Sequence, residues 1–309
     1  MPPVLAVASN LITTFQAIVL GALQGVTELF PISSLGHTVL FPHLFGWTNI
    51  VKWQSQPESP WLAFIVMLHV GSAVGLLIYF WRTWIELIKA WFVSVGRMIR
   101  LRRWSVETPA EHLAWLIVIA SIPTGILGIA LEHTARVATA KPLIAAIFLV
   151  VNGCILLGAE RLRRRADVRA LIRREGGSEI TGRNVDTLGY GEAAGMGVVQ
   201  SSALIAGISR DGIVMAAGLV RGLDNYSAGY FAFLLATPII LAAGVYKLSD
   251  LTGPLGNGIR GEALIAALVA AGFAVFTVAV LTRYLKRGNL TPFGIYCLVF
   301  GVAMIAYNA

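Results

Sequence analysis

The sequence is poor in charged residues. Asp, Glu, Lys and Arg occupy only 13% of the 309 positions, hydrophobic residues occupy 57%, and the mean hydropathy is +0.75. Soluble globular domains carry about 25% charged residues. The scarcity of charge therefore excludes a soluble domain and predicts an all-α integral membrane protein whose main solvent is lipid.

Cysteine is also scarce. Cys154 and Cys297 both lie inside apolar runs, which argues against a disulfide framework or a thiolate metal site and favours buried, inert thiols. No Lys or Arg precedes the first apolar stretch, so the charged region of a cleavable signal peptide is missing. We expect the first hydrophobic segment to stay in the protein.

Six apolar runs are long enough to cross a hydrocarbon core about 30 Å thick. They cover residues 61–81, 112–131, 142–159, 228–248, 263–285 and 292–307. Two further segments, 11–44 and 187–221, are apolar overall but are interrupted by Gly, Pro, Ser and charged residues. Because irregular backbone at membrane depth must be buried in protein or line a wet cavity, each is predicted to be a re-entrant helix-loop-helix.

The net charge of +8 does not indicate a nucleic-acid partner, because the basic residues gather in loops and do not spread over one face. Lys and Arg concentrate at 82–103 and 161–183, with a smaller group at 283–287. Cytoplasmic loops carry such an excess, so these three loops are predicted to be cytoplasmic and both termini to face outward. The arginine run is interpreted as this topology signal and not as a separate lipid site.

A short internal repeat is visible when residues 32–36 are set on residues 208–212, which also places Gln24 on Gln200. Each copy precedes three spans, so the second copy enters the membrane from the opposite face. This pattern predicts one transmembrane domain, 1–309, built as an inverted repeat of about 11–160 and 187–308, with a site near the bilayer midplane.

The first interrupted segment combines a carboxylate with hydroxyl and imidazole groups. Gln24 and Glu28 are four residues apart and share one helical face. Pro31 then disrupts the helix. A Ser33-Ser34-Leu35-Gly36 loop follows, in which free backbone N–H groups can converge on an anion, and His37 lies at its far end.

The second interrupted segment combines a guanidinium with a predicted helix start. Ser209 is expected to cap the helix that follows, and the positive end of that helix adds to the charge of Arg210. Arg210 is the one basic residue between Arg183 and Arg221, and an arginine at the bilayer centre costs roughly 2.5–3.5 kcal/mol. The segment therefore predicts an anion site.

Simpler interpretations compete with these roles. Arg210 and Glu28 could be structural partners that join the two halves, and His37 could be a buried histidine with satisfied hydrogen bonds. Asp211 could merely favour the helix N-terminus, with metal ligation or base catalysis as the other options. His69, in the first span, is more typical of a packed polar residue than of a ligand.

A phosphate-bearing ligand fits this donor set best. Glu28 would repel a phosphate unless a divalent cation lay between them, so Gln24 and Glu28 are predicted to bind Mg²⁺ or Ca²⁺ through oxygen atoms. In a different class of membrane phosphatase, the Ser-Arg pair is followed by five residues and then a His. Here the residue at that position is Ala216, which excludes that class.

The motifs resemble those of the bacterial undecaprenyl-diphosphate phosphatases, the bacitracin-resistance family. The matching residues are Gln24, Glu28, Pro31, Ser33, Ser34, Gly36 and His37 in the first segment, and Gly207, Ser209, Arg210 and Gly212 in the second. The resemblance covers nearly the whole chain, including residues 231–238. Three positions depart from it, with Ala206 in place of Pro, Asp211 in place of Ser and Val214 in place of Thr.

The resemblance implies hydrolysis of undecaprenyl diphosphate to the monophosphate lipid carrier of cell-wall synthesis, assisted by a divalent cation. It places the chain in the bacterial cytoplasmic membrane, with the active site open to the outer face. Because Val214 lacks a hydroxyl and Asp211 adds a negative charge, substrate preference or metal stoichiometry could differ from the family pattern.

The expected mechanism assigns the cation to Gln24 and Glu28 and the diphosphate to Arg210. The predicted substrate-binding set is completed by Ser33, Gly36, Ser209, Asp211 and Gly212. Ser34 would attack the terminal phosphorus with His37 as its base, or His37 would attack directly, or water would attack without either.

Two other functions remain open from the sequence. Inverted repeats with a midplane site are also a transporter arrangement, so the chain could move polyprenyl phosphate across the membrane. It could also be an impaired paralogue that binds the lipid without turnover, which restoring Ser at 211 and Thr at 214 would test. The sequence leaves open whether the protein forms a homodimer.

Overall fold

The computed structural model describes residues 12–54, 60–139, 141–173, 182–247 and 252–308. All named elements in these ranges are helices. They are α1 (Thr14–Thr27), α2 (Ser34–Leu44), α3 (Thr48–Gln54), α4 (Trp61–Tyr79), α5 (Trp81–Leu101), α6 (Pro109–Thr139), α7 (Pro142–Arg173), η3 (Val185–Thr187), α8 (Tyr190–Gln200), η4 (Ser201–Leu204), α9 (Arg210–Val220), α10 (Asn225–Tyr246), η5 (Pro254–Gly256), α12 (Arg260–Leu285) and α13 (Thr291–Asn308).

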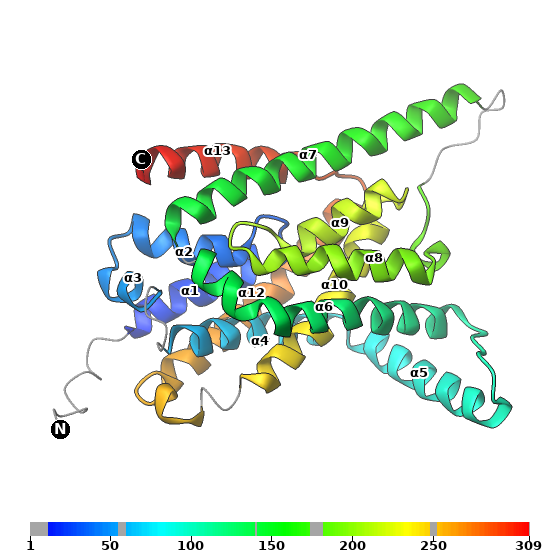
Figure 1. Cartoon of the computed structure of the whole chain (residues 1–309), viewed down its shortest axis with the longest axis horizontal. Coiled ribbons are helices and arrows are strands. Elements are labelled where there is room, and N and C mark those ends of the chain that lie inside the picture. The colour runs from blue at the N-terminus through cyan, green and yellow to red at the C-terminus, as the bar shows by residue number, and fades with distance from the viewer. Residues whose placement is uncertain (1–11, 55–59, 140, 174–181, 248–251, 309) are drawn as a thin grey trace.

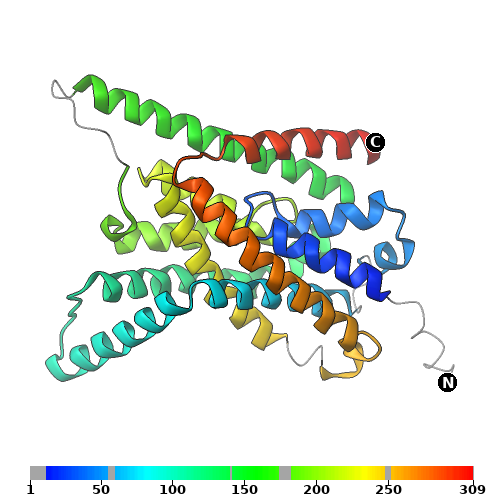
Figure 2. The same cartoon turned by 180° about the vertical axis from the view of Figure 1, so that it is seen from behind.

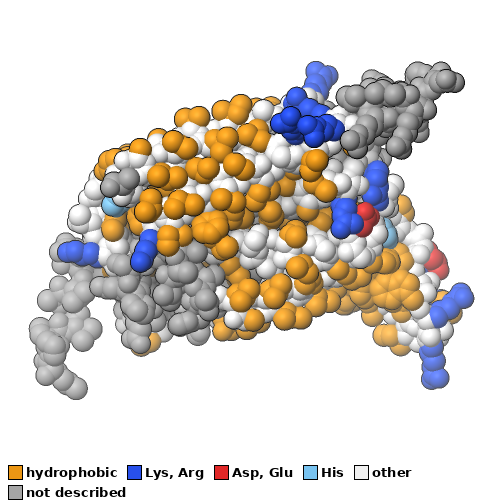
Figure 3. Space-filling view, turned by 45° about the horizontal axis from the view of Figure 1, so that its top comes forward, with side chains coloured by type: hydrophobic (Ala, Val, Ile, Leu, Met, Phe, Trp, Pro, Cys, Tyr) orange, Lys and Arg blue, Asp and Glu red, His pale blue; other side chains and the backbone are white. Residues whose placement is uncertain are grey.

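Six described helices are long and apolar enough to cross a membrane, as the sequence predicts. These spans are Trp61–Tyr79, Pro109–Leu131, Pro142–Ala166, Asn225–Tyr246, Arg260–Leu285 and Thr291–Asn308. Their outward side chains are apolar, and Phe276 and Val299 are each 65% exposed. Figure 3 shows hydrophobic side chains covering the middle of the molecule, with Lys and Arg gathered toward its ends. Such a surface suits lipid and not water.

The four helices of the two interrupted segments are too short to cross. α1 has 14 residues, and α2, α8 and α9 have 11 each, so none exceeds about 21 Å, against a core of about 30 Å. α1 ends at Thr27, a few residues before Pro31, and α9 begins after its cap, Ser209. Both segments are therefore helix-loop-helix units, as expected from the sequence.

The helices pack through small residues. α12 presents Ala266, Ala267, Ala270, Ala271 and Ala274, all buried, to α1 on one side and α4 on the other. Figure 2 shows α12, in orange, crossing the molecule diagonally beside α1 in blue. A Cβ atom added at Gly25 of α1 would lie 2.6 Å from Phe273 Cβ. Such close approach is how membrane helices gain van der Waals contact, because the surrounding lipid is as apolar as the side chains.

Two expectations about the loops are wrong. Residues 161–173, interpreted as part of the loop after the third span, continue the helix α7. Residues 82–103, interpreted from their charge as a loop, mostly form the helix α5. Its apolar side chains, including Trp84 and Trp91, pack against the largest hydrophobic cluster, and Arg97 forms a two-pronged ion pair with Glu111 of α6 at 2.9 and 2.8 Å. The basic residues suggested a loop, although the apolar residues of this segment recur at helical spacing. The resulting helix is stabilised by its packing on α6.

The ends of the bundle differ in charge. α1 begins and α13 ends at one end, on the left of Figure 1, while the far ends of α5 and α7 lie at the other. The basic residues at 97–103 and 161–165 belong to these far ends. The two loops that interrupt α1–α2 and α8–α9 lie between the ends, inside the bundle.

Candidate active site

The two interrupting loops meet, and Ser33 joins them. Its φ of +69° lies in the left-handed region, which is rare for a residue with a side chain. In this conformation Ser33 Oγ accepts the Gly36 N–H at 3.2 Å, which caps α2, and the Gly207 N–H at 3.1 Å. The second contact links positions far apart in the chain. Local strain of this kind persists where surrounding contacts enforce it.

Asn152, in the middle of α7, is a second link that sequence reasoning missed. Its Nδ2 donates to the Pro31 carbonyl at 2.9 Å, and its Oδ1 accepts the Ser209 N–H at 3.0 Å. One fully buried amide therefore satisfies one backbone group from each loop. An isolated Asn in an apolar helix was the available signal, because such a residue needs partners inside the membrane.

The same capping contact occurs in both loops. Ser209 Oγ accepts the Gly212 N–H at 3.0 Å, as Ser33 Oγ accepts that of Gly36. Ser209 is thus the N-cap of α9, as expected from the sequence. The N-terminal ends of α2 and α9 both lie at these loops, and the N-terminus of a helix favours an anion.

Glu28 is the centre of the polar cluster. Its carboxylate, 6% exposed as a residue, accepts hydrogen bonds from Gln24 Nε2 at 2.9 Å, from the Ser34 hydroxyl and from the Arg210 guanidinium. His69 Nε2 lies 3.3 Å from Glu28 Oε2. The structure therefore brings together Gln24, Glu28, Ser34 and Arg210, which the sequence proposed as parts of one site.

Arg210 connects the two halves through charge. Its guanidinium pairs with Glu28, and its Nε lies 3.7 Å from Asp211 Oδ1. The Arg210 side chain is 15% exposed, so the ion pair is mostly shielded from water. Removing one partner of such a pair strongly destabilises the protein, because the other charge is left buried without a partner.

Three oxygen atoms near this pair have no hydrogen-bond partner. They are both carboxylate oxygens of Asp211, a residue only 1% exposed, and Oε1 of Gln24. A buried carboxylate without a donor is costly, and hard oxygen atoms are the ligands that Mg²⁺ and Ca²⁺ prefer. The donor chemistry fits a divalent cation. No group of three or more His, Cys, Asp or Glu side chains among the described residues is arranged to hold a metal.

His37 lies outside the cluster. Its Nδ1 faces the Ser33 carbonyl at 2.7 Å, so this nitrogen is the donor, and Nε2 lies 2.8 Å from the Tyr296 hydroxyl. The ring is fully buried and stacks on Tyr296 and Phe300. Both ring nitrogens are thereby occupied, and neither forms a hydrogen bond with Glu28 or with Ser34.

His69, and not His37, lies near the Glu28 carboxylate. Its Nδ1 lies 2.8 Å from the Ile65 carbonyl, one turn earlier on α4, which directs Nε2 toward Glu28. The sequence favoured a packed polar residue here. A histidine inside an otherwise apolar span was the signal for a functional position.

Two of the departures from the family pattern are core positions in this structure. Val214 and Ala206 are each 1% exposed and belong to hydrophobic clusters. Asp211 is the third, and it is the one that changes the charge near Glu28.

Gly207 offers a test of how closely the loops must fit. Its φ is +103°, and an added Cβ would lie 2.7 Å from Leu149 N. In Gly207→Ala, the strain of a left-handed alanine alone is expected to destabilise the protein by about 1–3 kcal/mol. The clash of the added Cβ with Leu149 N should increase this loss. Thermal unfolding in detergent measures this. Gly191→Ala, where nothing lies within 4 Å of the added atom, is the control, and equal stability of the two variants would refute the tight fit.

Comparisons with known proteins place the chain in one family. The family model described as bacitracin resistance protein BacA matches residues 17–303. The chain is 47% identical to the undecaprenyl-diphosphatase of Mycolicibacterium paratuberculosis, covering 95% of this chain and 97% of that protein. It is 45% identical to undecaprenyl-diphosphatase 2 of Frankia alni, covering 94% and 96%, and 35% identical to undecaprenyl-diphosphatase 2 of Chromobacterium violaceum, covering 95% and 98%.

Proposed function

The chain belongs to the bacitracin resistance protein BacA family, and from this membership we propose that it is an undecaprenyl-diphosphatase. It hydrolyses undecaprenyl diphosphate to undecaprenyl phosphate and inorganic phosphate, which returns the lipid carrier to cell-wall synthesis. The observation that supports this most is the buried cluster in which Glu28 contacts Ser34 and Arg210. The relatives' names favour this hydrolase over a transporter.

Purified protein tests the function directly. With Mg²⁺ or Ca²⁺ in detergent, we expect phosphate release from a C55 diphosphate and none from the C55 monophosphate. Absence of phosphate release from the diphosphate by folded wild-type protein would refute the proposal.

The proposed topology has two re-entrant segments in an inverted repeat. α1 begins at Thr14 and α8 at Tyr190, and α2 begins at Ser34 and α9 at Arg210, all at the offset of the sequence repeat. α1 packs on α12 and α8 packs on α6, so each segment lies on a long helix of the other half. With the basic end in the cytoplasm, the site of this inner-membrane protein would open to the outer face. A homodimer stays a prediction.

The proposed chemistry begins at Ser34. Its hydroxyl donates to Glu28, so Glu28 would take the proton as Ser34 Oγ attacks the terminal phosphorus. The bond from that phosphorus to the bridging oxygen breaks, and undecaprenyl phosphate leaves. Arg210 and the N–H groups at the starts of α2 and α9 would stabilise the charge on the transferring phosphoryl group. Water then hydrolyses the phosphoserine.

Rapid quenching with substrate labelled on its terminal phosphate tests this assignment. We expect the label on Ser34, and no trapped label in Ser34→Ala. His37→Asn would still form phosphoserine, since His37 contacts Tyr296 and not Ser34. A label on His37 would overturn the assignment, and so would full activity of Ser34→Ala.

A divalent cation, Mg²⁺ or Ca²⁺, is proposed to bind Gln24 and Glu28, with Asp211 as an added ligand. Bound there, it would neutralise diphosphate charge. Mg²⁺ commonly uses one or two protein carboxylates and completes its shell with water and substrate phosphate. The unpartnered oxygens of Gln24 and Asp211 support this set.

Mn²⁺ binding, followed by electron paramagnetic resonance, tests the ligand set without any turnover. Asp211→Asn is expected to weaken Mn²⁺ affinity by roughly tenfold or more, the loss for one charged contact. Glu262→Gln, a half-buried carboxylate in the first turn of α12, should bind as wild type does. Equal affinity of Asp211→Asn and wild type would exclude Asp211 as a ligand.

A further inference from the structure

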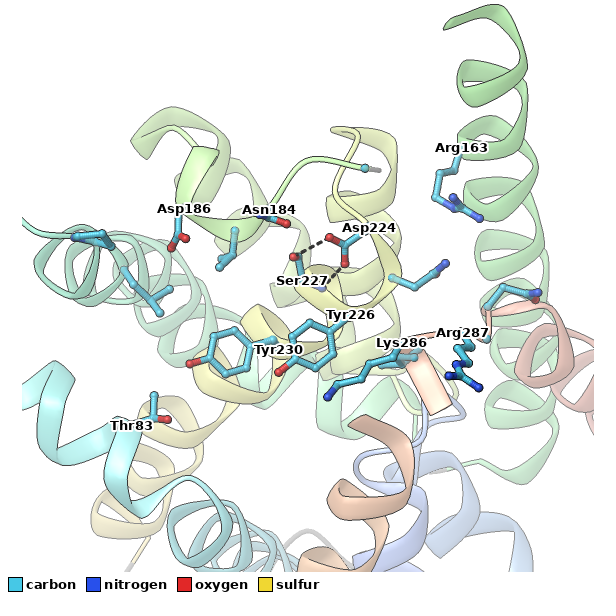
Figure 4. A pocket seen from close by; sticks show the side chains of 18 of the residues that line it. Thr83, Arg163, Asn184, Asp186, Asp224, Tyr226, Ser227, Tyr230, Lys286 and Arg287 are labelled. Carbon is cyan, nitrogen blue, oxygen red and sulfur yellow. Dashed lines mark hydrogen bonds between the residues drawn. The ribbon is translucent and has the colours of Figure 1, made fainter. Parts of the chain in front are cut away.

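A polar cavity lies away from the Glu28 cluster. Its volume is about 860 Å³, and none of the residues in the Glu28 cluster lines it. It forms where α5, α6 and α10 meet the loop at 182–186 and the turn at 286–289 after α12. The cavity therefore lies at the basic end of the bundle, at the ends of membrane-spanning helices (Figure 4).

The cavity has walls of opposite charge. Lys286, Arg287 and Arg163 lie on one side, and Asp186 lies on the other (Figure 4). Glu86 of α5 adds a second carboxylate to the lining. Within the described part of the chain, Lys286, Arg287, Asp186 and Glu86 form no salt bridge. No direct ion pair therefore joins these residues across the cavity.

Two tyrosines lie between these walls. The rings of Tyr226 and Tyr230 are 6.0 Å apart and nearly parallel, at 9°, and Lys286 Nζ lies 5.5 Å from the Tyr226 ring. Tyrosine is enriched at the level of lipid headgroups, where one end of the ring is apolar and the other wet. An aromatic face also attracts an ammonium group.

The rest of the cavity lining has a polar part and an apolar part. Asp224 is used within the protein, since it caps α10 by accepting the Ser227 N–H at 2.6 Å. Asn225 is 9% exposed and its Oδ1 has no donor. Leu87, Leu113 and Leu285, all buried, supply apolar surface beside these groups.

We propose that this cavity binds the headgroup of a zwitterionic aminophospholipid from the adjacent leaflet. The phosphate contacts Lys286 and Arg287, and the ammonium lies toward Asp186 and the face of Tyr230. The apolar lining takes the glycerol end of the lipid. A purely anionic headgroup would leave Asp186 and Glu86 facing negative charge, so the arrangement of charge selects a dipolar ligand.

Thermal unfolding of the purified full-length protein in detergent tests this site. A ligand that binds the folded state alone raises the unfolding temperature with its concentration. Short-chain phosphatidylethanolamine is expected to stabilise wild type more than short-chain phosphatidylglycerol does. Native mass spectrometry with the same lipids counts bound molecules, independently of phosphatase activity.

Variants on each wall identify the contacts. Lys286→Gln and Asp186→Asn are each expected to lower phosphatidylethanolamine affinity about tenfold, the loss for one charged contact. Lys286→Arg keeps the charge and should stay within a few-fold of wild type. Arg103→Gln is the matched control, because Arg103 is exposed at the same end and does not line the cavity.

Three results would overturn the proposal. Phosphatidylglycerol could stabilise the protein as much as phosphatidylethanolamine does, or Lys286→Gln and Asp186→Asn could both retain wild-type affinity. Stabilisation by ATP with none by either lipid would instead indicate a soluble nucleotide site. Since the readout is binding, each result is distinguishable from a failure of the proposed hydrolysis.

Discussion

Arg210→Ala is expected to lower phosphate release from undecaprenyl diphosphate by about 10³-fold or more, the effect of removing an arginine that stabilises a transferring phosphoryl group. The guanidinium lies at the start of α9 and contacts Glu28. In the proposed mechanism, removing it takes away the positive charge that neutralises the phosphate charge. Initial rates at saturating substrate measure this loss.

A purely structural role for Arg210 would also reduce activity, because breaking a buried ion pair from one side costs about 3–5 kcal/mol. Arg210→Lys separates the two roles. It keeps the charge near Glu28 and most of the stability but loses the planar fork, so we expect about 10²-fold lower activity in a folded protein. Arg221→Ala, with a half-exposed side chain after the end of the same helix, is the control. Wild-type activity in folded Arg210→Lys would make the residue a structural counter-ion.

Asn152→Leu is expected to destabilise the protein by about 2–6 kcal/mol, since the Pro31 carbonyl and the Ser209 N–H would each be left buried without a partner, at about 1–3 kcal/mol apiece. The loops that position Glu28 and Arg210 would also lose their shared support. We therefore expect a loss of activity beyond the loss of folded protein. Thermal unfolding and rates per folded molecule measure the two effects.

Asn152→Asp sharpens the test, because it keeps the acceptor for Ser209 but places a carboxylate oxygen against the Pro31 carbonyl. It should be at least as damaging as Asn152→Leu, although its shape is nearly unchanged. Cys154→Ala is the control, because Cys154, predicted from the sequence to be buried, lies at an exposed position of α7. If Asn152→Asp and Asn152→Leu match this control in stability and rate, the bridge between the loops is unimportant.

Much of the fold could be predicted from the chain alone. Hydropathy located all six spans, and the interruptions around Pro31 and Ser209 located the two short helix pairs. The error at residues 82–103 has a clear cause. Local charge suggested a loop, whereas the apolar side of α5 becomes stable as a helix through its packing on α6.

Part of the candidate site could also be predicted. Gln24 and Glu28 share a helical face through their spacing, and Arg210 needs a partner at membrane depth. The structure places all three together. Their catalytic roles remain predictions until the variants are measured.

The sequence determined the residues that carry charge, the breaks in the apolar segments that contain them and the membership of a family. Only the tertiary structure decided which histidine faces the carboxylate. His37 follows Ser34 closely in the chain, but its nitrogens turn to Ser33 and Tyr296, and His69 reaches Glu28 from a different helix. The direction of a side chain and its long-range partners depend on packing between helices, which local spacing does not encode.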